Sequence, residues 1–430
     1  MRLRYLSLFA GSLLACLSVE AAVADDLLPN TKAPPASAAS PGPIFATGWT
    51  STITHTLQFE AGIAGNPDDP ALGTNFGQLF TDRANEPTLN QVLFTLARPV
   101  DEAKPWDVGF NFQGLYGSDG RYDPTLGILD YATSGRYQPI LTQANIVIHS
   151  PFVIGSLDTK IGLYPGVMGY ETTDPSTRPF YTLSYVSNFL LAFEHVGVLS
   201  IWHVNPTLDI YAGIDAGNET TPWKDNNSVP AGYIGVGLNN LLDNKLTVLA
   251  VSRLGPEDSV RVLGPAANDY FRFWNDLTAT YKLNNQWAFT VEANYFRDDG
   301  IKDANGQVAT AYGFDGYIAY TINDQVTFNL RGEIYRDNTG LLTTSFPTNT
   351  GFVNGIAGYP DFYVNAPPTT YGALTAGLTL KPTFLNNNKF AKVTIRPEVR
   401  YDTSLNGTQP FDYLTKSNQL LLSTDIIVAF

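Results

Sequence analysis

Hydrophobic and polar side chains alternate along most of this chain in segments of about ten residues. In ITHTLQFEAGI, residues 53–63, Ile, Leu, Phe and Ala occupy most odd positions, and Thr, Gln and Glu occupy the even ones. Segments 106–117 and 392–402 repeat the pattern. A two-residue period gives an extended strand one apolar and one polar face, and ten residues suffice for a tilted strand to cross a bilayer. The pattern predicts membrane-spanning β-strands.

We expect sixteen such strands, with 14 to 18 compatible with the pattern. The expected strands begin near residues 52, 90, 106, 141, 157, 197, 207, 231, 245, 271, 286, 308, 324, 371, 390 and 418. The links between them alternate between long and short: 64–89, 118–140, 165–196 and 338–370 are long, whereas 205–206, 284–286 and 322–324 are short. Long external loops alternating with short periplasmic turns are typical of transmembrane barrels.

A soluble β-sandwich also shows alternation, because one face of each sheet packs in a core. A sandwich has no reason to sort its loops by length. Aromatic residues at segment ends, such as Trp106 and Tyr116 or Trp287 and Tyr295, suit the two interfacial girdles of a membrane barrel. The predicted fold is therefore all-β: a transmembrane antiparallel β-barrel with short periplasmic turns and long extracellular loops.

Charged residues fall on the polar face of many predicted strands. A Lys or Arg facing lipid at the midplane would cost about 2–4 kcal/mol, so their agreement on one face indicates a wet interior. Around sixteen strands enclose an aqueous lumen, whereas eight fill with side chains. The charged positions are Glu60, Asp107, Lys160, Asp209, Arg272, Asp276, Glu292, Asp315, Arg331, Glu333, Lys381, Arg396, Glu398, Arg400 and Asp425.

The sequence ends in LLLSTDIIVAF, an alternating segment that stops on the aromatic residue Phe430. In lipid every backbone group needs an internal partner, so the last strand of a barrel must close against the first. We interpret residues 418–430 as that closing strand. The terminal Phe430 also resembles the aromatic signature by which the outer-membrane barrel assembly machinery recognises its substrates, so this machinery is an expected partner.

The first residues have the features of an export signal. Arg2 and Arg4 precede an apolar stretch at 5–15, and Ala-Val-Ala at 22–24 forms a cleavage site. We expect a signal peptide at 1–24, a Pro/Ala-rich periplasmic lead-in at 25–47 and the barrel at 48–430. Cys16 lies in LLAC, which offers an alternative lipoprotein site, but the bulky Leu14 and the Ala-Val-Ala site favour cleavage after residue 24.

Composition narrows the class of protein further. Charged residues make up 15% and aromatic residues 13%, and the formal net charge is −14. Removal of residues 1–24 takes away two Arg and one Glu, which leaves −15 and no cysteine. An acidic chain argues against nucleic-acid binding, which needs a basic surface. Beyond the signal there is no apolar run long enough for a membrane helix.

Several stretches resemble the OmpL-like β-barrel porins. They are KIGLYPGVMGYETTD (160–174), LSYVSNFLLAFEHVGV (183–198), AGIDAGNETTPWKDNN (212–227) and TIRPEVRYD (394–402). The positions that carry the resemblance are Gly162, Gly166, Gly169, Tyr170, Glu171, Ser184, Tyr185, His195, Gly197 and Val198. The resemblance implies a barrel located in the outer membrane of a Gram-negative cell, with porin activity. It implies no particular solute.

The long link at 165–196 holds the main predicted site. General porins fold the loop at this place inward, and the segment YVSNFLLAF (185–193) is too apolar to be solvated. Acidic residues opposite basic ones would set a transverse field across the pore. The expected pore constriction consists of Glu171, Asp174, Arg178 and Glu194 from the loop, with Arg331, Arg396 and Arg400 from the wall. The alternative is an external loop that covers the rim or a neighbouring subunit.

Other chemistry has little support in the sequence. The four His residues are His55, His149, His195 and His203, no G-x-S-x-G occurs, and we predict no enzyme and no catalytic residue. We predict no cofactor and no dedicated metal site. Acidic external segments such as 215–227 and 303–307 suit Ca²⁺ loosely, together with lipopolysaccharide.

The expected function is that of an outer-membrane porin, a water-filled channel for passive diffusion of ions and small polar solutes. A barrel selective for sugars or carboxylates, with aromatic residues of 165–196 as a stacking track, is the first alternative. A structural or adhesive barrel closed by its loops is the second. Lipopolysaccharide is an expected partner, and a homotrimer is a candidate assembly by analogy with other porins.

Overall fold

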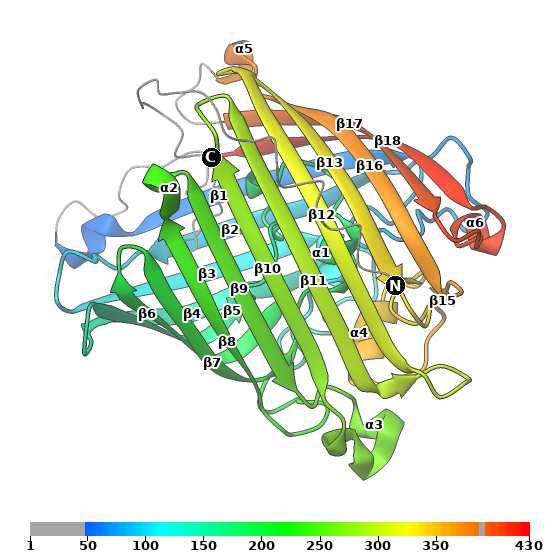
Figure 1. The fold of residues 1–430 in the computed structure, drawn as a ribbon, viewed down its shortest axis with the longest axis horizontal. Helices are drawn as coiled ribbons and strands as arrows, with labels where there is room; N and C mark the ends of the chain where they lie inside the picture. The colour runs from blue at the N-terminus through cyan, green and yellow to red at the C-terminus, as the bar shows by residue number, and fades with distance from the viewer. Residues whose placement is uncertain (1–47, 387–391) are drawn as a thin grey trace, which may run out of the picture.

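The computed structural model describes residues 48–386 and 392–430. Within them, sixteen antiparallel strands form one closed barrel, in which the last strand pairs with the first (Figure 1). The barrel strands are β1 (Thr54–Gly65), β2 (Pro87–Arg98), β3 (Asp107–Gly117), β4 (Gln138–Pro151), β5 (Ser156–Pro165), β6 (Glu194–Asn205), β7 (Leu208–Asn218), β8 (Ala231–Asn240), β9 (Leu246–Gly255), β10 (Arg272–Lys282), β11 (Trp287–Lys302), β12 (Val308–Asn323), β13 (Val326–Asp337), β16 (Thr369–Leu380), β17 (Lys392–Ser404) and β18 (Asn418–Ala429). The predicted fold class is confirmed.

The two strands outside the barrel and the helices are short. Strands β14 (Thr344–Ser345) and β15 (Val364–Asn365) pair with each other. The helical elements are η1 (Trp49–Thr52), η2 (Asp119–Arg121), η3 (Pro175–Thr177), α1 (Tyr185–Phe189), α2 (Leu241–Asn244), α3 (Val260–Leu263), η4 (Gly264–Asp269), α4 (Gly351–Ala357), α5 (Thr383–Asn386) and α6 (Phe411–Leu414). No helix in the described ranges is long and apolar enough to cross a bilayer.

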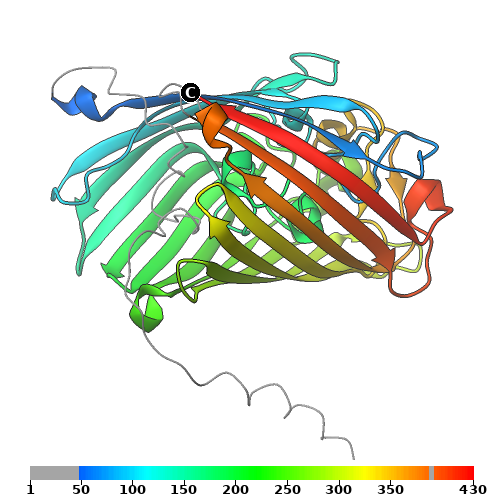
Figure 2. The same ribbon diagram turned by 90° about the horizontal axis from the view of Figure 1, so that it is seen from above.

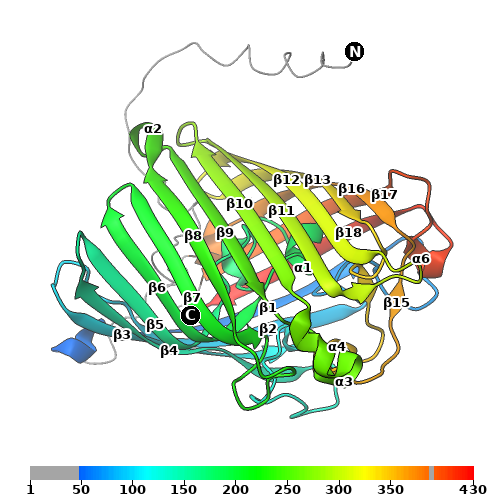
Figure 3. The ribbon, with the colours of Figure 1, turned by 60° about the horizontal axis from the view of Figure 1, so that its bottom comes forward.

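The two ends of the barrel differ, as the loop lengths predict. Helices α3, α4 and α6 lie at the end that carries the long loops, whereas α2 and α5 lie at the other end (Figures 1 and 3). One link departs from the alternation. Residues 303–307 form a short turn because β11 and β12 are 16 residues long each and continue beyond their neighbours.

The two-residue alternation of the sequence separates outward-facing from inward-facing side chains, as predicted. Outward positions expose large apolar residues, including Phe94, Phe112, Ile146, Ile234, Leu277, Phe314, Leu374 and Leu422. Inward positions hold buried charged residues, including Glu60, Asp209, Glu292, Arg331, Arg400 and Asp425. Lys381 was expected on this inner face, but it follows the last residue of β16 and is exposed, so that expectation is wrong.

Three strands begin three residues before their predicted starts, and each has an irregularity in its pairing with a neighbour; the extra residue lies on β2 and β4 themselves, but on β7 where it pairs with β6. Strand β2 begins at Pro87 with a shift beside Gln91, β4 at Gln138 with one beside Gln143, and β6 at Glu194 with one beside His195. A β-bulge inserts a residue and reverses the inward–outward alternation beyond it. The hydrophobic period therefore stops at the bulge, although strand pairing continues.

Candidate functional site inside the barrel

The link between β5 and β6, residues 166–193, folds into the barrel; we call it the inner loop. Helix α1 lies within the ring of strands in all three ribbon views (Figures 1, 2 and 3). The Tyr185 ring of α1 stacks on Tyr335 of β13 and Tyr371 of β16, with centroids 5.4 and 4.8 Å apart. The apolar segment that is unsuited to solvent packs on the inner wall rather than on the rim.

Backbone N–H groups of the inner loop bind carboxylates of the wall. Glu398 of β17 accepts from the Tyr181 N–H at 2.8 Å, and Glu333 of β13 accepts from the Tyr185 N–H at 2.8 Å. On the neighbouring strands β10 and β11, Asp276 accepts from Gly169 and Glu292 from Tyr170. Charge-assisted hydrogen bonds are the stronger kind, so four strands hold the path of the loop.

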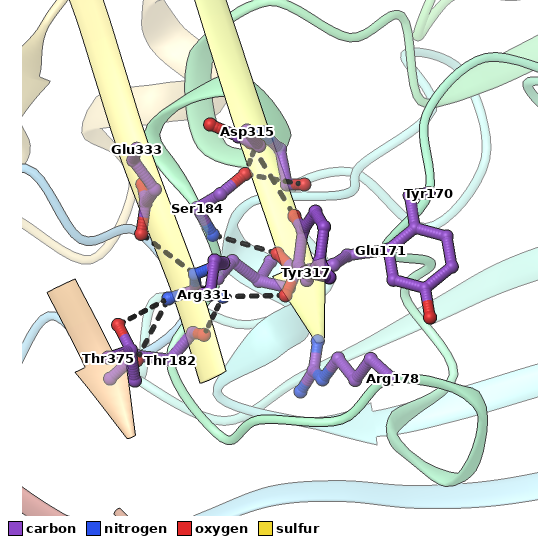
Figure 4. Close-up of polar contacts among 12 residues, drawn as sticks. Tyr170, Glu171, Arg178, Thr182, Ser184, Asp315, Tyr317, Arg331, Glu333 and Thr375 are labelled. Atoms are coloured by element: carbon purple, nitrogen blue, oxygen red, sulfur yellow. Dashed lines mark hydrogen bonds and ion pairs between the residues drawn. The ribbon is translucent and has the colours of Figure 1, made fainter. Parts of the chain in front are cut away.

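Arg331 stands at the centre of the first charged network (Figure 4). Its guanidinium donates to Glu171 of the inner loop at 2.6 Å and to Glu333 of its own strand at 2.7 Å. It also donates to the carbonyl oxygen of Thr182 at 2.9 Å. Arg400 of β17 donates to the same Glu333 at 2.7 Å, which joins two of the predicted wall residues in one network.

Arg396 forms a second network near the seam between β1 and β18. It is paired with Asp425 of β18 and donates to Glu60 of β1 at 3.1 Å. Glu60 also accepts from Arg178 of the inner loop at 3.2 Å. In addition, Arg396 donates to the backbone carbonyl oxygens of Pro175 and Arg178, both at 2.7 Å. This network fixes the inner loop against the closing strands.

Asp174 is the most accessible of the predicted loop residues and is half-buried. It accepts from the Gln58 side chain at 3.0 Å and caps η3 through the Ser176 N–H at 2.9 Å. It faces no arginine at ion-pair distance among the described residues. Its carboxylate therefore has hydrogen-bond donors but no cationic partner among the described residues.

Glu194 does not join the other six residues. It is the first residue of β6, fully buried, and lies near Asp123 and Glu219. The sequence predicts that Glu194 lies at the end of the long link, but it does not predict the course of the inner loop. That loop carries Glu171, Asp174 and Arg178 away from Glu194 to the opposite wall.

The acidic partners were visible in the sequence but were not assigned to the site. Glu60, Glu333, Glu398 and Asp425 lie on the polar face of their strands, yet they are neighbours of the arginines only through strand order and register. The two-residue spacing of Arg396, Glu398 and Arg400 was the available signal. This spacing is compatible with a ladder of lumen charges and at least as well with a set of structural wall pairs.

The interior is not lined by charge alone. A buried hydrophobic cluster extends from Val186 and Leu190 of the inner loop to Leu199, Tyr211 and Leu249 on the inner wall of β6, β7 and β9. Part of the lumen is therefore filled by side chains, and the charged networks lie beside this apolar packing.

A closed sixteen-stranded barrel with apolar residues outside, charged residues inside and a long loop folded into the lumen defines the class of outer-membrane porins. The chain belongs to the family described as "Putative beta-barrel porin-2, OmpL-like", which matches residues 52–430. The recognised family resemblance is confirmed, and the protein is an outer-membrane channel.

Solved structures with the same fold share little sequence with the chain. The anion-selective porin from Comamonas acidovorans is 11% identical with a TM-score of 0.56, covering 88% of this chain and 99% of its own. The outer membrane channel DcaP of Acinetobacter baumannii is 9% identical with a TM-score of 0.51, covering 88% and 96%. OmpT of Vibrio cholerae, in its trimer form, is 12% identical with a TM-score of 0.50, covering 88% and 98%. No curated protein sequence matches the chain.

Proposed function

We propose that the protein is a passive diffusion channel for ions and small polar solutes, with the inner loop as its narrowest part. One observation carries this proposal: the inner loop leaves the wall at β5 and β6, crosses the lumen and is bound to the opposite wall at β1, β13 and β17. A loop fixed in this way reduces the cross-section available to solutes. Glu171, Asp174, Arg178, Arg331, Arg396 and Arg400 are the constriction residues that the proposal retains.

The local charges favour cations over anions. The arginines of the constriction are each paired with carboxylates, whereas Asp174 lacks a cationic partner among the described residues. Asp276, Glu292 and Asp315 place three further acidic residues on the adjoining strands β10, β11 and β12. Because a lumen attracts ions of opposite sign, we expect mild cation selectivity.

The test is single-channel conductance of refolded residues 25–430 in a planar bilayer, with the reversal potential measured in a salt gradient. Asp174→Asn should shift the reversal potential toward weaker cation preference, and Asp174→Lys should shift it further. Glu86→Gln, at an exposed residue of an external loop, is the matched control and should leave it unchanged. A folded barrel that gives no conductance steps would refute the open-channel proposal.

A substrate-selective barrel is the second proposal, because aromatic rings accompany the inner loop. Half-buried Phe189 and Phe193 pack against the same buried cluster as Phe346 and Phe352 of the loop between β13 and β16. Partly accessible rings offer faces on which sugars stack. Liposome swelling with neutral sugars separates the proposals: a channel selective for sugars passes them faster than other solutes of equal size, and Phe193→Ala removes the difference.

We also propose the partners expected from the sequence. The barrel assembly machinery would engage the closing strand through Phe430, and lipopolysaccharide would contact the external loops. The trimer form of Vibrio cholerae OmpT supports a homotrimer. Cross-linking of the protein in native membranes, followed by gel analysis, tests that assembly. The predicted signal peptide and lead-in, residues 1–47, lie outside the described residues, and export is tested by N-terminal sequencing of the mature protein.

A further inference from the structure

Two arginines face outward at the external end of the barrel. Arg297 is on β11 and Arg336 is the last residue but one of β13, and β12 lies between these strands (Figure 1). The residues on either side of each arginine along the chain are buried, apart from those that follow the strand turn outward with them, so both side chains point away from the lumen. Arginine on the lipid-facing surface is unfavourable except close to the headgroups. The pair therefore needs a polar environment at the outside of the wall.

The outward-facing residues change character toward this pair. The register places Tyr295 of β11 opposite Tyr312 of β12, and Tyr312 opposite Arg336. The two tyrosines are 42% and 50% exposed, and the next outward positions toward the other end are Phe314 and Ile334, which are 52% and 54% exposed. Tyrosine rings between apolar and charged positions are typical of a membrane interface. The arginines therefore lie at the level of the headgroups of the outer leaflet.

Neutral side chains hold Arg336 in place. Its Nε donates to the side-chain oxygen of Asn338 at 3.0 Å, and its Nη1 donates to the Thr370 hydroxyl at 3.2 Å. Asn338 donates to the Thr310 hydroxyl at 2.9 Å, and Thr310 is the cross-strand neighbour of Arg297. Within the described ranges no carboxylate lies at ion-pair distance from Arg336. Its guanidinium is thus oriented, but its charge is not compensated.

Arg297 has one acidic neighbour. Its Nε and Nη2 both lie 2.6 Å from Asp299, in an ion pair whose arginine and aspartate side chains are 45% and 28% exposed. An ion pair this exposed is weak, and a guanidinium has N–H donors beyond the two that Asp299 engages. Arg297 can therefore bind a further anion from the membrane side.

We propose that Arg297 and Arg336 bind phosphate groups of lipopolysaccharide on the outer wall of the barrel. Guanidinium groups bind phosphate through paired hydrogen bonds, and basic residues at a membrane surface attract anionic headgroups. The patch lies at the end with the long loops, in the leaflet where lipopolysaccharide is the anionic lipid of an outer membrane. The acyl chains would lie against the apolar rows that include Phe314 and Ile334. The proposal deepens the proposed contact with lipopolysaccharide, and it does not rest on channel activity.

The test measures binding of fluorescently labelled rough lipopolysaccharide to refolded residues 25–430 in zwitterionic micelles, by fluorescence anisotropy and with a chelator present. Binding should persist without divalent cations, because arginine supplies the positive charge, and it should weaken as salt is added. Lipopolysaccharide stripped of phosphate should bind about tenfold more weakly. Because conductance is not measured, the result is separate from that of the channel proposal.

The double variant Arg297→Gln, Arg336→Gln should weaken binding about tenfold or more. The control Lys245→Gln, Lys381→Gln removes the same charge from exposed residues beside α2 and α5, at the other end of the barrel, and should bind like the wild type. Asp299→Asn removes a carboxylate that competes for Arg297 and repels phosphate, so it should tighten binding several-fold. A purely structural role of these side chains predicts no such gain.

Heat-modifiable mobility on gels checks that each variant is folded. If the double variant does not fold, Arg297→Gln alone decides, with an expected loss of several-fold. Unchanged binding by the arginine variants, or an equal loss in the lysine control, would overturn the proposal. Equal affinity for phosphatidylglycerol would assign the patch to anionic lipids in general, and displacement by millimolar inorganic phosphate would assign it to free phosphate. Either result would overturn the assignment to lipopolysaccharide.

Discussion

The arginines of the inner wall are the most constrained residues of the protein. Arg331, Arg396 and Arg400 are at most 1% exposed. The guanidinium group of each donates to carboxylates of the wall and also to a backbone carbonyl oxygen of the inner loop. A buried ion pair adds little to stability compared with apolar packing, but the loss of one partner leaves an uncompensated charge. These residues therefore fix the conformation of the loop more than they strengthen the barrel as a whole.

Arg331→Met should destabilise the barrel by about 3–5 kcal/mol, because Glu171 and Glu333 would remain buried without their central partner. Urea unfolding of the refolded protein in micelles measures the change. Arg297→Gln breaks a pair with Asp299 in which the arginine side chain is 45% exposed, and it should change the free energy of unfolding by less than about 1 kcal/mol. Equal effects of the two substitutions would contradict the argument.

Asp82 gives the external loops a defined response to acid. Burial raises its pKa, but Arg121 and Arg136, each 2.7 Å away, outweigh that effect and lower the pKa to about 2. A lowered pKa means that the contribution to stability is complete above the ordinary value of 3.8 and is lost as pH falls through about 2. The loop residues around these arginines should therefore resist an acid-tolerant protease at pH 4 and become cleavable near pH 2.

Asp82→Asn is the control for this acid response. Because the neutral amide cannot pair with Arg121 and Arg136, the variant should be cleaved at pH 4 as readily as the wild type is near pH 2. Cleavage of the wild type that does not change between pH 4 and pH 2 would show that Asp82 does not hold these loops.

The observed strands show which strand boundaries the hydrophobic pattern predicts correctly and which it does not. Alternation predicts the regular strands well, and the start of β12 at Val308 and that of β18 at Asn418 coincide with the predicted ones. It fails at β2 and β4, where bulges place two successive polar residues on the inner face, and at β6, where the extra residue of the irregular pairing lies on β7. Asn90 and Gln91, for example, both bind Asp119. A two-residue period does not predict such an insertion, because the partners of these residues, Asp119 after β3 and Thr173 of the inner loop, are distant in sequence.

The bulge in β2 brings its backbone so close to β3 that a residue without a side chain is required at position 117 of β3. A Cβ atom at Gly117 would collide with the carbonyl oxygen of Asn90, whereas one at Gly316 of β12 would meet no atom within 4 Å. Gly117→Ala should therefore destabilise the barrel by about 1–3 kcal/mol through forced displacement of the β2 backbone. Gly316→Ala, also within a spanning strand, should be close to neutral. Thermal unfolding of both variants checks the difference, and equal midpoints would contradict it.

For the whole molecule, strand order was predictable and the contents of the lumen were not. Neighbouring strands are consecutive in the barrel sequence, so register follows from local pattern and short turns. The site depends on contacts between distant segments: Arg331 and Glu171 are 160 residues apart, and Arg396 and Glu60 are 336 apart. An apolar segment in a long link indicates that the loop packs on something, but it does not specify which wall residues receive it.

Closure of the barrel makes the last residue part of the structure. The Phe430 N–H donates to the carbonyl oxygen of Leu57 at 2.8 Å, Leu57 donates back to Phe430 at 3.2 Å, and the Phe430 ring meets Phe59 edge-on. Deletion of Phe430 removes both hydrogen bonds and the ring, and it should destabilise the refolded barrel by about 1–3 kcal/mol. Unfolding in micelles measures this loss.

Phe430→Ala separates closure from recognition by the assembly machinery. The backbone bonds to Leu57 remain, so the refolded variant should lose no more than about 1 kcal/mol, the worth of one aromatic contact at a half-exposed site. If the machinery reads the terminal ring, the amount of the variant in the outer membrane should nevertheless fall several-fold, as measured by heat-modifiable mobility on gels of isolated membranes. Normal amounts of Phe430→Ala alongside reduced amounts of the deletion would mean that the ring is not read and that closure alone limits assembly.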